Sequence, residues 1–183
     1  MLSRRSFISG AIGSLVTTGR AFALGGYGAY GLWDAIMAMQ GIEEGEGPLV
    51  NILVVRGCDK SGLVWTETRR YLGVLRIRWL PVYEGHESNK VFVAAALADK
   101  TSATLSRVVL DDDEMVDVGE EDIAAAMAQE RIYSGRVARL LWESSGRPPA
   151  MPSYVYKDGT GRVKVIDGAL RPERYLDLAL EAG

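Results

Sequence analysis

The only cysteine among the 183 residues of this chain is Cys58, in the run Cys58-Asp59-Lys60-Ser61. A thiolate can attack a disulfide bond, and the product is a mixed disulfide between the two molecules. A second thiol is needed to release that intermediate, and Ser61 stands where a Cys-x-x-Cys run would carry one. Any thiol–disulfide exchange at Cys58 must therefore be completed by a thiol from outside this chain.

Two elements are predicted to hold Cys58 in place. Residues 49–55 are almost all apolar, which predicts a strand that is covered on both faces of an α/β sheet. Residues 61–72 mix apolar and charged side chains as an amphipathic helix does. Cys58 would then lie at the start of a helix, where the helix dipole and the free backbone N–H groups favour an anionic sulfur.

The neighbours of Cys58 are expected to act on its sulfur in opposite ways. Lys60 places a cation nearby and Asp59 an anion, so their effects roughly cancel and the helix dipole dominates. The hydroxyl of Ser61 has two predicted uses, which are alternatives. It can donate to the sulfur, or it can cap the helix by accepting from its N–H groups.

The other segments predict one α/β domain. Residues 74–83 alternate apolar and charged side chains, which predicts a strand parallel to 49–55 and completes a strand–helix–strand unit. Further helices are predicted at 32–39, 91–97, 123–141 and 172–180, with Met127, Leu176 and Leu180 on their apolar sides and a loop at 41–48. Residues 153–156 and 162–166 predict a hairpin around the Asp158-Gly159 turn.

In this order the parts resemble the thioredoxin superfamily, and most of all the catalytic domains of periplasmic disulfide-bond isomerases. Two places within residues 33–181 carry the resemblance: the strand-to-helix junction at Cys58, and Met151-Pro152 directly before a strand. The resemblance implies a thioredoxin-like α/β fold, with a βαβ half, a helical insertion at about 87–147 and a ββα half. It also implies a cis peptide bond before Pro152 that faces the thiol and leaves the backbone of Met151 to pair with an extended client.

The first 23 residues resemble a twin-arginine export signal. Arg4 and Arg5 form the pair, a mildly apolar stretch follows, and Ala21-Phe22-Ala23 offers a small-x-small cleavage site. We expect a signal at 1–23, a leader with a short helix at 24–47 and the domain at 48–183. The protein would be periplasmic, with no stable membrane insertion after signal removal.

Composition narrows the classes of partner. The whole chain has a net charge of −3, and without residues 1–23 it has 18 basic and 24 acidic residues, a net charge of −6. Such a charge argues against nucleic acid and anionic lipid as partners. One cysteine and one histidine (His86) cannot supply a usual zinc ligand set, and no phosphate-binding or dinucleotide motif is present, so no metal and no cofactor are expected. The acidic run 111–114 is predicted to be a solvated loop or the first turn of a helix rather than a metal site.

Two functions remain open from the sequence. The first is an exported monothiol protein that exchanges thiols and disulfides with protein clients or a small thiol. Its catalytic residues would be Cys58, Ser61 and Pro152, with Met151, Lys60 and Asp59 in contact with the client. The second is a non-catalytic binding or chaperone-like accessory protein, favoured by Ser61 and by the expected lack of the isomerases' N-terminal dimerisation domain. A thiol peroxidase is a weaker third option, because it needs a charged partner for the sulfur and only Arg56 is adjacent in sequence.

Overall fold

A six-stranded sheet forms the centre of the computed structural model, which describes residues 20–23, 27–110 and 117–183, with side chains from residue 31 onward. The strand order is β1-β6-β5-β3-β4-β2. The strands are β1 (Arg20–Ala23), β2 (Ile42–Gly45), β3 (Leu49–Val55), β4 (Arg76–Val82), β5 (Ser153–Lys157) and β6 (Val163–Asp167). The neighbours β3 and β4 are parallel, and the other pairs are antiparallel.

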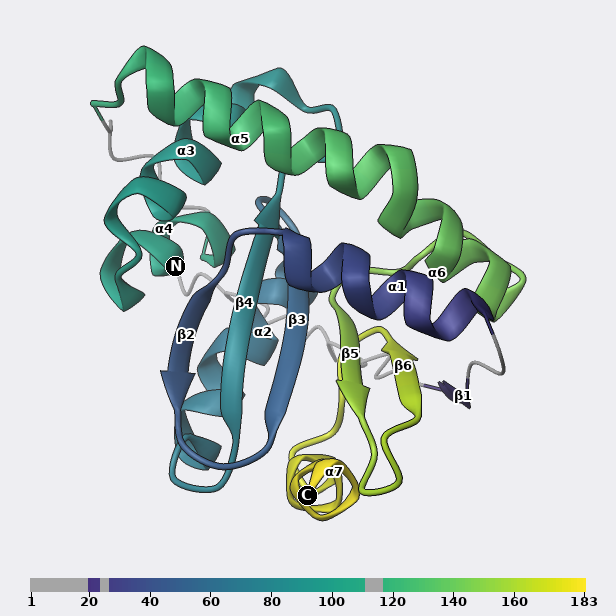
Figure 1. Cartoon of the computed structure of the whole chain (residues 1–183). Helices are drawn as coiled ribbons and strands as arrows, with labels where there is room; N and C mark the ends of the chain where they lie inside the picture. Colours follow the sequence, from purple (N-terminus) through teal and green to yellow (C-terminus); the bar gives the residue numbers. More distant parts are fainter. Residues whose placement is uncertain (1–19, 24–26, 111–116) are drawn as a thin grey trace, which may run out of the picture.

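Helices cover both faces of this sheet. They are α1 (Tyr27–Ala38), α2 (Asp59–Thr68), α3 (Lys90–Asp99), α4 (Ser102–Val109), α5 (Glu120–Ile132), α6 (Ala138–Ser145) and α7 (Arg174–Ala182). A π-helical turn, Tyr133–Val137, joins α5 to α6, and short 3₁₀ turns span Arg69–Tyr71 and Glu87–Asn89. Figure 1 shows α1 in front of the sheet, α2 behind it and α5 along its upper end. In the described parts of the chain, no helix has both the length and the apolar character needed to cross a bilayer.

The alternation of side chains along β3 builds a core on each face of the sheet. Val50, Ile52 and Val54 join the cluster that packs against α2, α4 and α7. Leu53 and Val55 point the other way and join the cluster under α1, α6 and the π-helical turn. Because both faces of β3 are buried, its sequence is a continuous apolar run, as the prediction of a covered strand requires. A third, smaller cluster joins α3 to α5.

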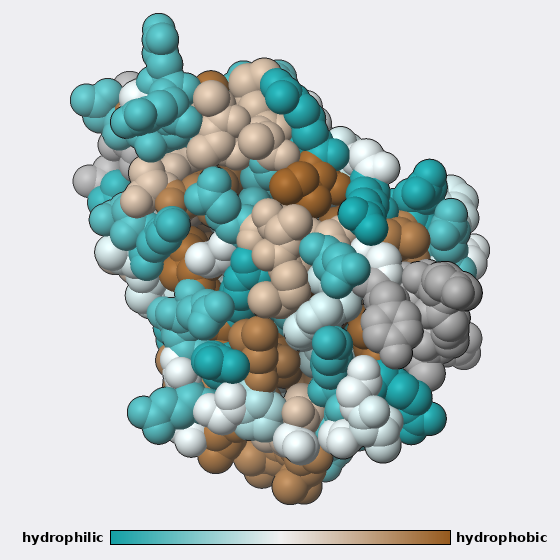
Figure 2. All heavy atoms as spheres, viewed as in Figure 1, coloured by the Kyte–Doolittle hydropathy of each residue, from teal (hydrophilic) through white to brown (hydrophobic). Residues whose placement is uncertain are grey.

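Three positions predicted on apolar helix faces are instead exposed. Met127 is 36 % exposed, and on α7 Leu176 and Leu180 are 53 % and 82 % exposed. The side chains that α7 buries are Tyr175 and Leu178, which are three residues apart and therefore share the opposite side of the helix. Apolar side chains accordingly gather at the lower end of the molecule, over α7, in Figure 2.

The sheet has two more strands than the hydrophobic pattern predicts. The segment predicted as a loop at 41–48 contains β2, which pairs antiparallel with β4. This strand is held by polar side chains, because Glu44 accepts hydrogen bonds from Arg69 and from Nε1 of Trp79. Residues 20–23, assigned to the end of the export signal, pair antiparallel with β6 as β1.

Candidate functional site

Strand register brings three segments of the chain to one edge of the sheet. β3 and β4 run parallel with Val55 opposite Val82, so the residues that follow both strands leave at the same edge. β5 runs antiparallel to β3 with Ser153 opposite Leu53, so the residues before β5 arrive there. Open α/β sheets bind ligands at the carboxyl ends of their parallel strands. Cys58 lies on the first of these three segments.

Cys58 occupies the N-cap position of α2. Gly57 precedes it with φ +75, a left-handed conformation that glycine adopts without penalty, and this turn leads the chain from β3 into α2. The carbonyl of Cys58 accepts hydrogen bonds from the N–H groups of Ser61 (2.8 Å) and Gly62 (3.3 Å). Its thiol is partly buried against the cluster under α1 and α6. The sulfur therefore lies at the positive end of the α2 dipole, with part of its surface open to solvent.

The second wall of the site is formed by Met151 and Pro152. The peptide bond between them is cis, and both residues are buried. Sγ of Cys58 donates to the carbonyl oxygen of Met151 over 3.7 Å, although the two residues are 93 positions apart in the sequence. The Pro152 carbonyl accepts from the N–H of Gly168 at 2.8 Å, which fixes this segment to the end of β6. The structure thus brings together the two places that carry the sequence resemblance.

Ser61 has a different partner from the two that were predicted. Its side chain is fully buried, and its Oγ accepts a hydrogen bond from the N–H of Val55, the last residue of β3, at 3.4 Å. Among the described residues no side chain caps the N-terminus of α2. The hydroxyl therefore ties the helix start to the strand end.

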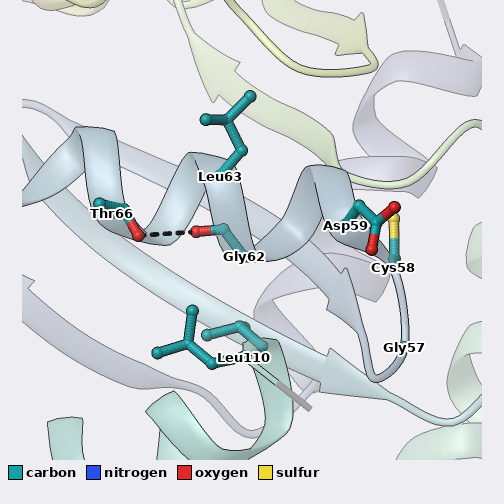
Figure 3. A pocket seen from close by; sticks show the side chains of 8 residues that line it. Gly57, Cys58, Asp59, Gly62, Leu63, Thr66 and Leu110 are labelled. Carbon is teal, nitrogen blue, oxygen red and sulfur yellow. Dashed lines mark hydrogen bonds between the residues drawn. The ribbon is translucent and has the colours of Figure 1, made fainter. Parts of the chain in front are cut away.

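Asp59 and Lys60 occupy the first turn of α2 and are both exposed. Figure 3 shows the side chains of Asp59 and Cys58 pointing to the same side of this turn. Arg56, the other charged residue close in sequence, stacks its guanidinium on the ring of Phe92, 3.8 Å from the ring centre. The structure therefore places an acidic group, rather than the Arg56 guanidinium, in the lining next to the sulfur.

A hollow of about 420 Å³ opens beside the sulfur, between α2 and the end of α4 (Figure 3). We call it the thiol hollow; it is lined by Gly57, Cys58, Asp59, Gly62, Leu63, Thr66, Val109 and Leu110. Leu63 and Leu110 are about half exposed, at 48 % and 54 %. Gly62 allows this arrangement, because a Cβ there would lie only 2.8 Å from the carbonyl oxygen of Val109. The thiol therefore has an apolar neighbourhood on one side.

A buried carboxylate lies close to the proline segment and was not singled out from the sequence. Asp167, the last residue of β6, is 3 % exposed and accepts from Oγ of Ser153 at 3.1 Å. Arg147 approaches its other oxygen at 3.7 Å. Burial raises the pKa of Asp167, while the Ser153 hydrogen bond and Arg147 act against that rise. An aspartate at the end of a strand gives no sequence signal for this role, because Ser153 and Arg147 come from distant positions.

No metal site is apparent in the residues that the structure describes, where no three His, Cys, Asp or Glu side chains cluster. His86 is exposed and directly precedes the 3₁₀ turn Glu87–Asn89. The acidic run 111–114 lies outside the described residues.

Two solved structures from Wolbachia pipientis resemble this chain. The thiol-disulfide exchange protein α-DsbA2 superimposes with a TM-score of 0.53 at 14 % sequence identity, covering 85 % of this chain and 94 % of that one. A double cysteine-to-alanine variant of α-DsbA1 gives a TM-score of 0.49 at 10 % identity, covering 81 % and 94 %. No protein-family model matches the sequence, and no curated protein sequence matches it either. The likeness to α-DsbA2 concerns the fold, and it confirms the predicted class: the chain has a thioredoxin-like α/β fold, with a helical insertion between a βαβ half and a ββα half.

Proposed function

We propose that this protein takes part in thiol–disulfide exchange through Cys58, and that another molecule completes its reaction. The observation that carries the proposal is the position of the thiol: partly exposed at the N-terminus of α2, with Sγ 3.7 Å from the carbonyl oxygen of Met151. A helix N-terminus stabilises the thiolate, which is the attacking species. The fold is shared with α-DsbA2, which is itself a thiol-disulfide exchange protein.

The proposed reaction has two steps: Cys58 is oxidised to a mixed disulfide in the first and returns to a thiolate in the second, so the complete cycle leaves its redox state unchanged. In the first, the Cys58 thiolate attacks one sulfur of a client disulfide, a bond forms between the two sulfurs, and the other client sulfur leaves as a thiolate that takes up a proton. In the second, a thiolate of the client or of a small thiol attacks the client sulfur of this mixed disulfide. Cys58 then leaves as a thiolate. Because no position of the sequence other than 58 holds a cysteine, this chain has no second thiol that could release the intermediate.

The remaining predicted site residues have roles in this proposal. Met151 and Pro152 form the wall that the client meets opposite the sulfur, and Asp59 and Lys60 contact it from the first turn of α2. Ser61 positions the helix start through its hydrogen bond with the N–H of Val55. The client would be a protein thiol or disulfide, or a small thiol.

Trapping of the intermediate tests the proposal. Incubation with a small aromatic disulfide should add one aromatic thiol to each chain, and the adduct should persist for hours after excess reagent is removed, because no second thiol is present. Intact-mass spectrometry measures the adduct, and an added external thiol should reverse it. Cys58→Ser should show no adduct. Failure of the folded native protein to form the adduct would exclude exchange at Cys58.

A second candidate function is a binding module that uses the same surface without redox turnover. The burial of Ser61 and its hydrogen bond with Val55 favour it, because this position serves the packing of the helix. The two candidates differ in Cys58→Ser, which would retain client binding in a binding module and lose client capture in an exchange protein.

We also propose export to the periplasm, supported by the Arg4-Arg5 segment. In a bacterium with a twin-arginine pathway, replacing both arginines by lysine should remove most of the protein from the periplasmic fraction, because lysine does not reproduce the planar guanidinium. Fractionation and immunoblotting measure this, with the lysine replacement of Arg171 and Arg174 as the control. Equal export of both variants would contradict the route. Cleavage after Ala23 would remove the edge strand β1, so the N-terminal residue of the exported form should be determined as well.

A further inference from the structure

A second hollow lies at the sheet edge that carries Cys58. It measures about 670 Å³, within the usual range of ligand pockets. We call it the Glu84 hollow; its main lining residues are Glu84, Tyr133, Trp142, Glu143, Pro148 and Pro149. Glu84 follows β4, and the two prolines belong to the segment that leads to Met151, whose carbonyl meets the Cys58 thiol. A client bound at Cys58 would therefore lie at the same edge of the sheet as this hollow.

The backbone is unusual at two points of the Glu84 hollow. Glu84 has φ +47, in the left-handed region that residues other than glycine seldom adopt. Tyr133 begins the π-helical turn, a type of irregularity that occurs often at functional sites. The hydroxyl of Tyr133 donates to Oε1 of Glu84 at 2.8 Å, which joins the two irregular segments. This hydrogen bond fixes the Glu84 carboxylate at the wall of the hollow.

Negative charge gathers around Tyr133. Burial is the main cause that raises the pKa of this tyrosine, and the carboxylates of Glu84, Glu130 and Asp167 raise it further. Glu130 is 8 % exposed and accepts from the N–H of Tyr83 at 3.1 Å. The cation that lines the hollow, Arg139, already lies 3.7 Å from Glu143. The interior of the hollow thus complements a positively charged group.

The other wall is apolar and aromatic. Trp142 is 52 % exposed, and it lines the hollow together with Pro148 and Pro149. An indole ring with an open face attracts cations, and an aliphatic stem packs well against proline. A carboxylate, an aromatic face and an apolar wall together match a lysine or arginine side chain, which has a charged head on an aliphatic stem.

We propose that the Glu84 hollow binds a basic side chain of the polypeptide client that Cys58 engages. This inference rests on the proposed function, and it adds a preference for clients with lysine or arginine close to their cysteine. Glu84 would be a specificity-determining residue that contacts the client without touching the reacting sulfurs.

Two peptides that differ at one residue test this preference. Each carries one cysteine as a mixed disulfide with an aromatic thiol, and a nearby residue is either arginine or glutamine. Attack of Cys58 on the peptide sulfur releases the aromatic thiolate, whose absorbance gives the second-order rate constant. The arginine peptide should react about fivefold faster at low salt, the factor for one charge pair about 4 Å apart in water, and the advantage should shrink at about 1 M salt.

Glu84→Gln should abolish that advantage and leave the rate with the glutamine peptide unchanged. The amide oxygen can still accept from Tyr133, so the variant removes the charge and keeps the hydrogen bond. Glu173→Gln makes the same charge change at an exposed position at the start of α7, outside the hollow, and should keep the full advantage. Equal rates with the two peptides in the native protein would overturn the inference.

A binding experiment separates this inference from the proposed function. Isothermal titration calorimetry of Cys58→Ser with a cysteine-free arginine peptide should show binding that Glu84→Gln weakens about fivefold. If the peptide binds in this way but the native protein shows no reaction at Cys58, exchange would be refuted and the basic-residue site would be retained. Reaction at Cys58 with neither arginine preference nor binding would refute the site and retain exchange.

Discussion

Ser61→Cys should turn the long-lived mixed disulfide of Cys58 into a short-lived intermediate. Residues 58 and 61 share the first turn of α2, because the N–H of Ser61 donates to the carbonyl of Cys58 at 2.8 Å. Side chains three positions apart in a helix are neighbours, so a thiol at position 61 is held next to the mixed disulfide. The effective concentration of a thiol held in this way is higher than that of any external thiol. We therefore expect the adduct to decay at least about 100-fold faster than in the native protein. Intact-mass time courses after removal of the aromatic disulfide measure the decay.

A second cysteine placed elsewhere is the matched control. Ser102→Cys adds a thiol at the start of α4, at the opposite end of that helix from the thiol hollow. Its adduct should decay as slowly as that of the native protein. If Ser61→Cys folds, by circular dichroism, and still keeps the adduct for hours, then the Cys58 sulfur does not face the first turn of α2 in the way the structure indicates.

The secondary structure on either side of Cys58 and of Pro152 follows from the residues next to them in the sequence. An apolar run that ends in Gly57-Cys58 before an amphipathic segment requires a strand that leads into a helix, whatever the rest of the chain does. Met151-Pro152 stands directly before β5 for a similarly local reason, because proline excludes a helix there and an alternating run follows. The predicted fold class depends on the order of these local units, and it is confirmed.

The features that sequence reasoning missed depend on partners far along the chain. β2 has two glutamates in four residues, and it forms a strand because β4 offers an edge and Arg69 meets Glu44. The Glu84 hollow depends on the hydrogen bond between Tyr133 and Glu84, which are 49 positions apart in the sequence. Ser61 could be placed at a helix start, while its partner depended on how the end of β3 meets that turn. The outward positions of Leu176 and Leu180 depend on which side of α7 meets the sheet, and a nine-residue helix with several apolar residues leaves that choice open.

Arg78→Met should lower the free energy of unfolding by about 1–3 kcal/mol for each buried acceptor that is left without a donor. Arg78 lies on β4 and is 7 % exposed. Its guanidinium donates to the carbonyl oxygens of Ile36 and Met39, at the C-terminal end of α1, and to Oδ1 of Asn51 at 3.2 Å. Methionine fills a similar volume but leaves these buried acceptors without a donor. Urea denaturation followed by circular dichroism measures the loss as a lower midpoint with an unchanged slope.

Arg76→Met distinguishes the buried network from the general effect of losing a positive charge on β4. Arg76 is exposed two residues earlier on the same strand, so its replacement should change the free energy of unfolding by less than about 0.5 kcal/mol. The loss of stability in Arg78→Met should also affect the exposure of the Cys58 thiol, because α1 and Cys58 pack in the same core cluster. Loosening α1 would then expose Cys58, and its alkylation should accelerate below the unfolding midpoint. Equal stability of the two variants would show that Arg78 does not hold α1 on the sheet.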